Sequence, residues 1–295
     1  MMVQKAWLGA LCVSSLAMTA AADQSITAAG VTVQVRGQSG KMTLTIPGAD
    51  PDNPDVVECQ MVALRQVDEN GVTLGSGGSD KQSFNSFATQ SFTFSDPVES
   101  TYQGLATSEI EFQSVLAGSS NVNIKTMIFQ ESGAVQVGEE SFNVTQGAVK
   151  FNVELSSWSW CDGSGSCRSD DGVGAAVELD LDMYLRGSTP QSKGNGNGSA
   201  SFELGGGQEL VMLTTYSVDN GVNWVSMPAG YPSTSGSVFT LKFPRWADGG
   251  TVLYDPIIQY IEYGGSTPSD RASSALSTPT ATAVLVLAAA GFCAL

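Results

Sequence analysis

Apolar and polar residues alternate along most of this chain, and no long segment repeats its apolar residues with the period of a helix. Alternation of this kind is typical of strands that bury one face and expose the other. Many short strands separated by turn residues predict an all-β fold of antiparallel β-sandwich type. The alternation is clearest in residues 31–35, 42–46, 110–115, 122–127, 149–155, 177–183, 239–243 and 257–261.

Turn signals separate these segments. Two Asn-Gly pairs, at 70–71 and 220–221, each lie close behind an aspartate and between valines. Because Asn-Gly supplies the positive φ angles of a two-residue hairpin turn, we predict a tight hairpin at both places. Residues 75–80 and 187–200 are rich in glycine and serine, which predicts loops.

A loose internal repeat indicates how the strands are grouped. The strand at 41–46 and the long strand after it resemble the strand at 150–155 and its own successor. We therefore predict two tandem β-sandwich domains, at 23–147 and 148–263. One large sandwich is the alternative, because single β domains reach this length.

The first 22 residues have the order of a secretory signal peptide. Lys5 is followed by an apolar run at 6–18 and by three alanines at 20–22. The run is too short to span a hydrocarbon core of roughly 30 Å. We expect cleavage between Ala22 and Asp23, and so a secreted chain.

The other end has the pattern of a glycosylphosphatidylinositol (GPI) signal. A small, polar, Pro-containing linker at 264–282 precedes an apolar tail at 283–295. Small residues, a polar spacer and a short apolar tail are what the anchoring machinery removes and replaces. We predict attachment at Ser273, which begins a run of three small residues. A short tail-anchor helix or a C-terminal strand is the alternative.

The charge of the chain excludes one class of partner. Because Lys5 leaves with the signal and all 29 acidic residues remain, the mature chain has 12 basic side chains and a net charge of −17. Nucleic-acid binding needs basic surface, so no nucleic-acid partner is expected. The same charge attracts calcium and other cations.

The chain contains no histidine. This excludes Ser-His-Asp and Cys-His catalysis and every metal site that uses an imidazole ligand. Chemistry based on two carboxylates, as in glycan-processing enzymes, is not excluded by this argument.

Three cysteines remain in the mature chain, in an oxidising compartment where thiols pair. Cys161 and Cys167 bracket a short Gly/Ser loop, and we predict that they form a disulfide. Cys59 is then either a small buried apolar residue or a link to another chain. Two sequons that predict surface glycosylation begin at Asn143 and Asn197.

One strand carries a row of carboxylates. Glu178, Asp180 and Asp182 alternate with apolar residues, so they lie on one face at intervals of about 6.6 Å. Such a row fits a calcium or mineral surface. The other interpretation is an ordinary solvated face opposite the core.

Aromatic residues offer a second candidate site. Trp158 and Trp160 share one face of a strand end, and Tyr231 lies in a turn rich in proline and glycine. Exposed, these rings would stack on sugars. The alternative is that the two indoles cover one end of the sandwich core.

The second half contains four distinctive phrases, which are VKFNVELSSWSWC (149–161), MPAGYP (227–232), FTLKFPRW (239–246) and LYDP (253–256). In this order they resemble phrases of coral acidic skeletal organic matrix proteins and their uncharacterised secreted relatives in other eukaryotes. Residues before 149 show a looser likeness. The long aspartate runs of that family are absent, because the longest run here is Asp170-Asp171.

The resemblance implies an extracellular matrix or surface protein with no active site and an association with calcium carbonate. Together with the two terminal signals, it predicts a GPI-anchored, non-enzymatic surface protein with a structural or adhesive role. Expected partners are the extracellular matrix, a cell-wall glycan or a mineral surface, and the membrane through the lipid. No cofactor is expected, apart from calcium. The alternatives are a carbohydrate-binding surface protein and a carboxylate-based glycan-processing enzyme.

Overall fold

The computed structural model describes residues 22–46, 55–74, 87–116, 120–138, 140–162, 175–186, 191–196, 199–205, 207–219 and 221–260. These residues form strands and connecting segments without a helix, which confirms the all-β prediction. None of the described segments forms a helix that could reach across a lipid bilayer. The strands belong to one compact unit, which ends at Ile261; a second unit begins at Glu262, beyond the described part.

The first sheet has eight antiparallel strands. Its strand β5 (Thr73–Leu74) pairs with β4 beside the main path. In spatial order, the main path is β1 (Gln24–Ala28), β2 (Val31–Val35), β3 (Met42–Ile46), β4 (Asp55–Val67), β13 (Glu178–Arg186), β20 (Val238–Pro244) and β19 (Ser233–Ser235).

The second sheet has twelve strands, and a separate hairpin is formed by β10 (Gly133–Val137) and β11 (Glu140–Val144). Its main path is β14 (Gln191–Gly196), β15 (Ser199–Gly205), β16 (Gln208–Leu213), β22 (Ile257–Tyr260), β12 (Val149–Ser156), β21 (Thr251–Tyr254), β17 (Thr215–Ser217) and β18 (Trp224–Ser226). Four strands extend it beyond β12: β9 (Asn121–Phe129), β8 (Leu105–Val115), β7 (Val98–Tyr102) and β6 (Thr93–Phe94).

Both sheets combine strands from the two halves of the chain. In the first sheet β4 pairs with β13, and in the second β9 pairs with β12 over their full common length. The predicted division at 147/148 into two separate sandwiches is therefore corrected. Alternation along a strand shows which face is buried but not which strand lies beside it, so the repeat was no guide to pairing.

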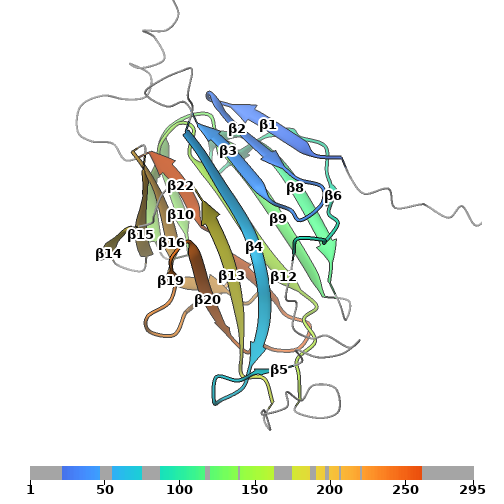
Figure 1. The fold of residues 1–295 in the computed structure, drawn as a ribbon. Coiled ribbons are helices and arrows are strands. Elements are labelled where there is room, and N and C mark those ends of the chain that lie inside the picture. The colour runs from blue at the N-terminus through green and yellow to red at the C-terminus, as the bar shows by residue number, and fades with distance from the viewer. Residues whose placement is uncertain are drawn as a thin grey trace, which may run out of the picture. The chain divides into compact units, whose positions relative to one another are not determined.

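The two sheets lie in layers with one core between them, and Figure 1 shows β8 and β9 behind β1, β2 and β3. Aromatic side chains join the layers: the Phe239 and Phe202 ring centroids are 4.9 Å apart, and Phe243 lies 5.1 Å from Tyr216 and 6.0 Å from Tyr254. All three contacts connect β20 of the first sheet to strands of the second. This is the packing of a β-sandwich.

Strand β13 illustrates how the alternation builds the core. Its neighbours are β4 on one side and β20 on the other, so it lies inside the first sheet. Leu179, Leu181 and Met183 point into the core and are at most 2% exposed. Glu178, Asp180 and Asp182 occupy the opposite face, as their spacing predicts.

The two Asn-Gly segments lie in hairpin loops that are longer than predicted. The loop between β4 and β5 spans residues 68–72, and the one between β17 and β18 spans 218–223. Each is closed by its aspartate: Asp68 Oδ1 accepts the Val72 N–H at 2.8 Å, and Asp219 Oδ1 accepts the Asn223 N–H at 2.6 Å. An aspartate that bonds the backbone ahead of it stabilises a wider loop than Asn-Gly alone.

We predict that Leu181→Ala lowers the free energy of unfolding by about 2–5 kcal/mol, because it opens a cavity in a fully buried position of an inner strand. Denaturant titration measures the loss. Val115→Ala is the control, since Val115 is 64% exposed at the end of β8. A similar small loss in both variants would contradict the shared core.

Candidate functional surface

The outward side of the first sheet collects polar and charged residues, and we call it the polar face. It includes the predicted carboxylate row on β13. Cross-strand neighbours on the same side come from β3, β4 and β20, for example Thr43 opposite Glu58, and Asp180 opposite Arg65 and Lys242. The row is therefore one part of a larger charged surface.

Each carboxylate of the row already has a partner. Lys242 Nζ contacts the Glu178 carboxylate and lies 3.0 Å from Asp180 Oδ1. Arg65 Nη1 is 2.5 Å from Asp182 Oδ2, and Thr240 donates to Asp182 Oδ1 at 2.9 Å. Asp180 and Asp182 are each 9% exposed. The row is thus less exposed to solvent than the outward side of a typical surface strand.

The ionisation of the row reflects this burial. Loss of water raises the pKa of Asp180 above its usual value, although Lys242 acts in the opposite direction. For Lys242, burial by itself lowers the pKa, but the hydrogen bonds to Glu178 and Asp180 outweigh it and the pKa is raised. The hydrogen bond to Asp182 raises the pKa of Arg65. A calcium ion at the row would have to displace these two cations.

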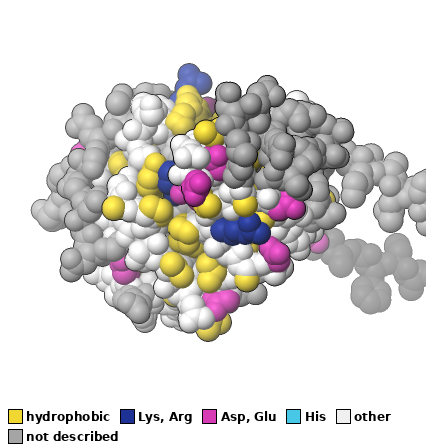
Figure 2. Space-filling model, turned by 90° about the horizontal axis from the view of Figure 1, so that it is seen from below, with side chains coloured by type: hydrophobic (Ala, Val, Ile, Leu, Met, Phe, Trp, Pro, Cys, Tyr) yellow, Lys and Arg dark blue, Asp and Glu magenta, His cyan; other side chains and the backbone are white. Residues whose placement is uncertain are grey.

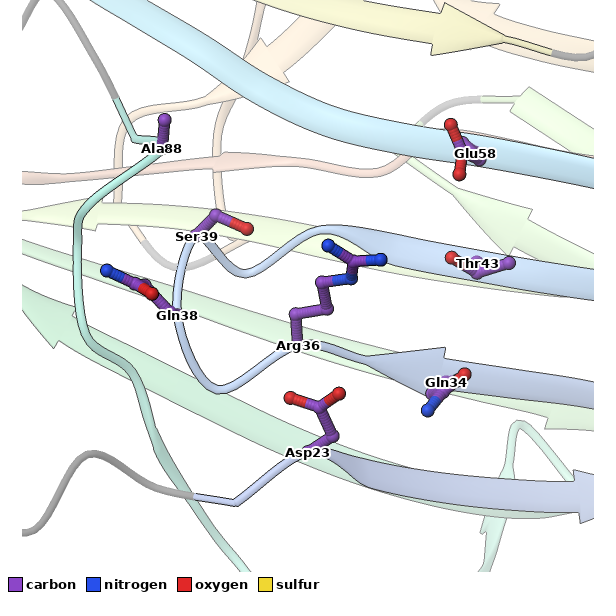
Figure 3. Close-up of a pocket in the computed structure, with 8 residues that line it drawn as sticks. All are labelled: Asp23, Gln34, Arg36, Gln38, Ser39, Thr43, Glu58 and Ala88. Carbon is purple, nitrogen blue, oxygen red and sulfur yellow. The ribbon is translucent and has the colours of Figure 1, made fainter.

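A polar hollow of about 500 Å³ lies at the edge of the polar face. Figure 3 shows its residues projecting from β2, β3 and β4 and from the segments beside them. Its charged members are two carboxylates and one guanidinium, so the negative charge is only partly compensated. The lining residues are Asp23, Gln34, Arg36, Gln38, Ser39, Thr43, Glu58 and Ala88.

The two carboxylates of the hollow are engaged in structural contacts. Asp23 Oδ1 accepts the backbone N–H of Gly37 at 3.0 Å, and Glu58 Oε1 is 2.6 Å from Lys41 Nζ. The hydrogen bond from Lys41 lowers the pKa of Glu58, so this group stays ionised. A general acid needs a raised pKa, and therefore Glu58 is unsuited to the general-acid role in glycan hydrolysis. The arrangement can hold a small polar or ionic group.

Within the described residues, no cluster of three or more Cys, Asp and Glu side chains has the geometry to hold a metal ion. Figure 2 shows acidic side chains scattered on the face seen there, some with basic side chains beside them, rather than gathered in one block. The charges thus form a distributed surface and not a coordination centre.

The proposed sugar platform is corrected by the structure. Trp158 and Trp160 are 5% and 9% exposed, so neither presents an open ring face. Trp160 packs edge-to-face against Trp246, with centroids 4.6 Å apart, as core aromatics do. Tyr231 is half-buried, and its ring centre lies 5.1 Å from Lys242 Nζ. Both indoles therefore pack against the core, which was the alternative prediction for them.

The other predicted sites have separate outcomes. Cys161 is buried, while Cys167 lies outside the described residues, so the disulfide stays a prediction. Cys59 is a buried thiol, and burial raises its pKa to about 12, which makes it unreactive. Asn143 is exposed on β11, as a glycan requires. Asn197 and Ser273 lie outside the described part.

The outward side of the second sheet contains residues that the sequence did not single out. Lys125 Nζ is 2.6 Å from Glu109 Oε2, and Asn123 donates to Glu111 Oε1 at 2.7 Å. Burial and the nearby charge of Glu111 raise the pKa of Glu154. Lys150 is buried completely on the same side. These positions alternate with core residues and so resemble a solvated face in the sequence.

Residues 11–200 match the family model of acidic skeletal organic matrix protein. The match covers 190 of the 295 residues and extends through β1–β13 into the strands of the second half. It reaches into the part before residue 149, where the likeness was looser, and ends before the phrases at 227–256. A match over more than half of the chain shows the family. This chain therefore belongs to the acidic skeletal organic matrix protein family.

Proposed function

We propose that this protein is a non-enzymatic component of an extracellular matrix, held at the outer cell surface by a GPI anchor, which contacts calcium-rich mineral through exposed carboxylates. Family membership supports the matrix role and the absence of catalysis. The terminal signals support secretion and anchoring. The contribution of the fold is a rigid sandwich that presents charged side chains on both outer faces.

The observation that carries the mineral contact is the way in which the sheets use their basic residues. Ion pairs within the fold take up most lysines and arginines of the described part, which leaves the exposed carboxylates to set the potential outside. Each of the following basic residues has a carboxylate oxygen within 4.0 Å: Lys41, Arg65, Lys125, Lys150, Arg186, Lys242 and Arg245.

Exposed carboxylates are better placed for mineral contact than the row on β13. Glu69, Asp96 and Glu131 lie in turns and connections at the ends of strands, where a flat surface can approach them. The row would first have to release Lys242 and Arg65. We therefore assign adsorption to the exposed carboxylates and a structural role to Glu178, Asp180 and Asp182.

Adhesion through sugars has less support. The two buried indoles leave Tyr231 as the remaining aromatic candidate, and this ring is already covered in part by Lys242. Glycans at Asn143 and Asn197 would belong to the protein itself and would shield its surface. The structural role is accordingly the one that we propose, with calcium as a surface partner and not a bound cofactor.

We predict that the mature protein adsorbs to calcite and that two triple variants of equal charge differ. Glu69→Gln/Asp96→Asn/Glu131→Gln should lower adsorption clearly, because these groups reach the mineral. Glu178→Gln/Asp180→Asn/Asp182→Asn should lower it less but should lower the free energy of unfolding by roughly 1–3 kcal/mol per broken charged hydrogen bond. Adsorption isotherms at fixed ionic strength measure the first effect.

Three outcomes of this comparison are informative. Absence of adsorption by the wild-type protein would refute the mineral role. A larger loss of adsorption in the variant of Glu178, Asp180 and Asp182 would place the adsorption site on β13. Equal losses that disappear at high salt would show diffuse attraction alone, because salt screens charges beyond about 8 Å at physiological strength.

We further predict that phosphatidylinositol-specific phospholipase C releases the protein from intact cells. The released chain should end near Ser273 and carry the glycan core of the anchor, since the apolar tail at 283–295 is replaced by lipid. Mass spectrometry of the C-terminal peptide identifies the site. A mature chain that still ends at Leu295 would contradict anchoring.

A further inference from the structure

Lys150 lies on β12, in the interior of the second sheet, and its side chain is 0% exposed. It points to the outward side, where its cross-strand neighbours are Met127 and Ile257. Both neighbours belong to a small apolar cluster that includes residues of the β10–β11 hairpin. A lysine in such surroundings is rare, because an ammonium group loses its hydration there.

Few groups surround the Lys150 amine. Asp255 Oδ2 lies 3.1 Å from Nζ, and Asn152 Oδ1 accepts a hydrogen bond from it. The Tyr102 ring centre is 5.1 Å away. The charge of Lys125 also repels an ammonium group at this place. The amine is therefore held between one carboxylate, one amide and one aromatic ring.

The ion pair with Asp255 is incompletely satisfied. Asp255 is 4% exposed, and none of the described residues provides a hydrogen-bond partner for its Oδ1. Removing two charges from water is costly, and a single contact between them offsets this cost poorly. Burial lowers the pKa of Lys150, which makes the neutral amine easier to form. A desolvated lysine of this kind is a competent nucleophile.

We propose that Lys150 and Asp255 condense to form an intramolecular isopeptide bond. Proton transfer within the pair gives a neutral amine and a carboxylic acid. The amine lone pair attacks Cγ of Asp255, the N–C bond forms, and one C–O bond breaks. One carboxyl oxygen leaves as water with two of the three ammonium protons, so no oxidant, reductant or co-reactant is needed.

The geometry favours this reaction after folding. Lys150 Nζ and Asp255 Oδ2 are 3.1 Å apart in a buried site, so folding has already brought the two side chains together and most of the entropy cost of their encounter is met before the reaction. The site excludes the bulk water that would favour hydrolysis. Asn152 acts as a positioning residue, since its oxygen orients the amine. The product replaces two buried charges by a neutral amide.

The bond would close a long covalent loop inside the second sheet. Lys150 is on β12, and Asp255 lies between β21 and β22, both of which pair with β12. A crosslink across such a loop restricts the unfolded chain and resists mechanical separation of the strands. This would suit a protein that is embedded in a matrix.

Tryptic mapping of the secreted full chain under denaturing conditions tests the proposal. Acylated Lys150 resists trypsin, so peptide 126–168 should remain uncut and be joined to peptide 246–271. The joined pair should weigh less than the sum of the two by one water. Lys242 and Asp180, 3.0 Å apart but partly solvated, are the internal control and should remain unlinked.

Variants identify the atoms. Asp255→Ala should abolish the link, whereas Asp255→Asn should give the wild-type product by loss of ammonia. Asn152→Ala should slow the formation of the link, because the amine is no longer oriented, but should leave Asp255 as the residue that is joined. Cleavage after Lys150 in wild-type protein, which yields free peptides 126–150 and 151–168, would overturn the proposal whatever the variants do. A link from Lys150 to Asn152, with loss of ammonia, would also overturn it.

Discussion

Hydrogen bonding between strands that are distant in the sequence holds this molecule together. β13 lies between β4 and β20, and β12 lies between β9 and the pair β21 and β22. β4, β13, β9 and β12 would each lose one edge of backbone partners if the halves separated, and buried unpaired backbone groups are costly. The core between the sheets exists because both pairings form together. The charged side chains on the outward faces of both sheets project from these paired strands.

The outward faces of the two sheets use charge in different ways. On the first sheet, acidic side chains are balanced by arginine and lysine from neighbouring strands, which ties β13 to β4 and β20 through side chains as well as backbone. On the second, Lys150 and Asp255 are withdrawn from water altogether. Carboxylates at strand ends remain exposed and carry the acidic character of the family to the surface.

The sequence was informative about local structure. Alternation located β2 and β3 to the residue and β12 to within one residue. It also found the start of β13, which continues three residues beyond the predicted end, and placed its three carboxylates on one face. The ion-pair partners of these carboxylates could not be predicted from local sequence, because Arg65 precedes Asp182 by 117 residues and Lys242 follows Asp180 by 62. Periodicity reports which side a residue faces and not what lies there.

The same limit explains the remaining differences. Trp158 and Trp160 follow the end of β12 and are both buried, and only the position of Trp246 shows that Trp160 is enclosed. Lys150 alternates with Phe151 and Val153 and so looks solvated; its burial depends on Tyr102, a residue of another strand. The hollow likewise depends on neighbouring strands that local patterns do not specify. Long-range pairing is the missing information in these cases, whereas the wider hairpin loops are closed by local hydrogen bonds that Asp68 and Asp219 accept.

Native-state hydrogen exchange tests this account most directly. If the halves share both sheets, slowly exchanging amides of β4 and β9 should open with the same free energy as those of β12 and β13, because they protect one another in one cooperative unit. Mass spectrometry resolves the four strands. Opening of β4 and β9 at a lower free energy, while β12 and β13 stay protected, would show two independent domains. It would contradict the conclusion that both halves of the chain share the two sheets.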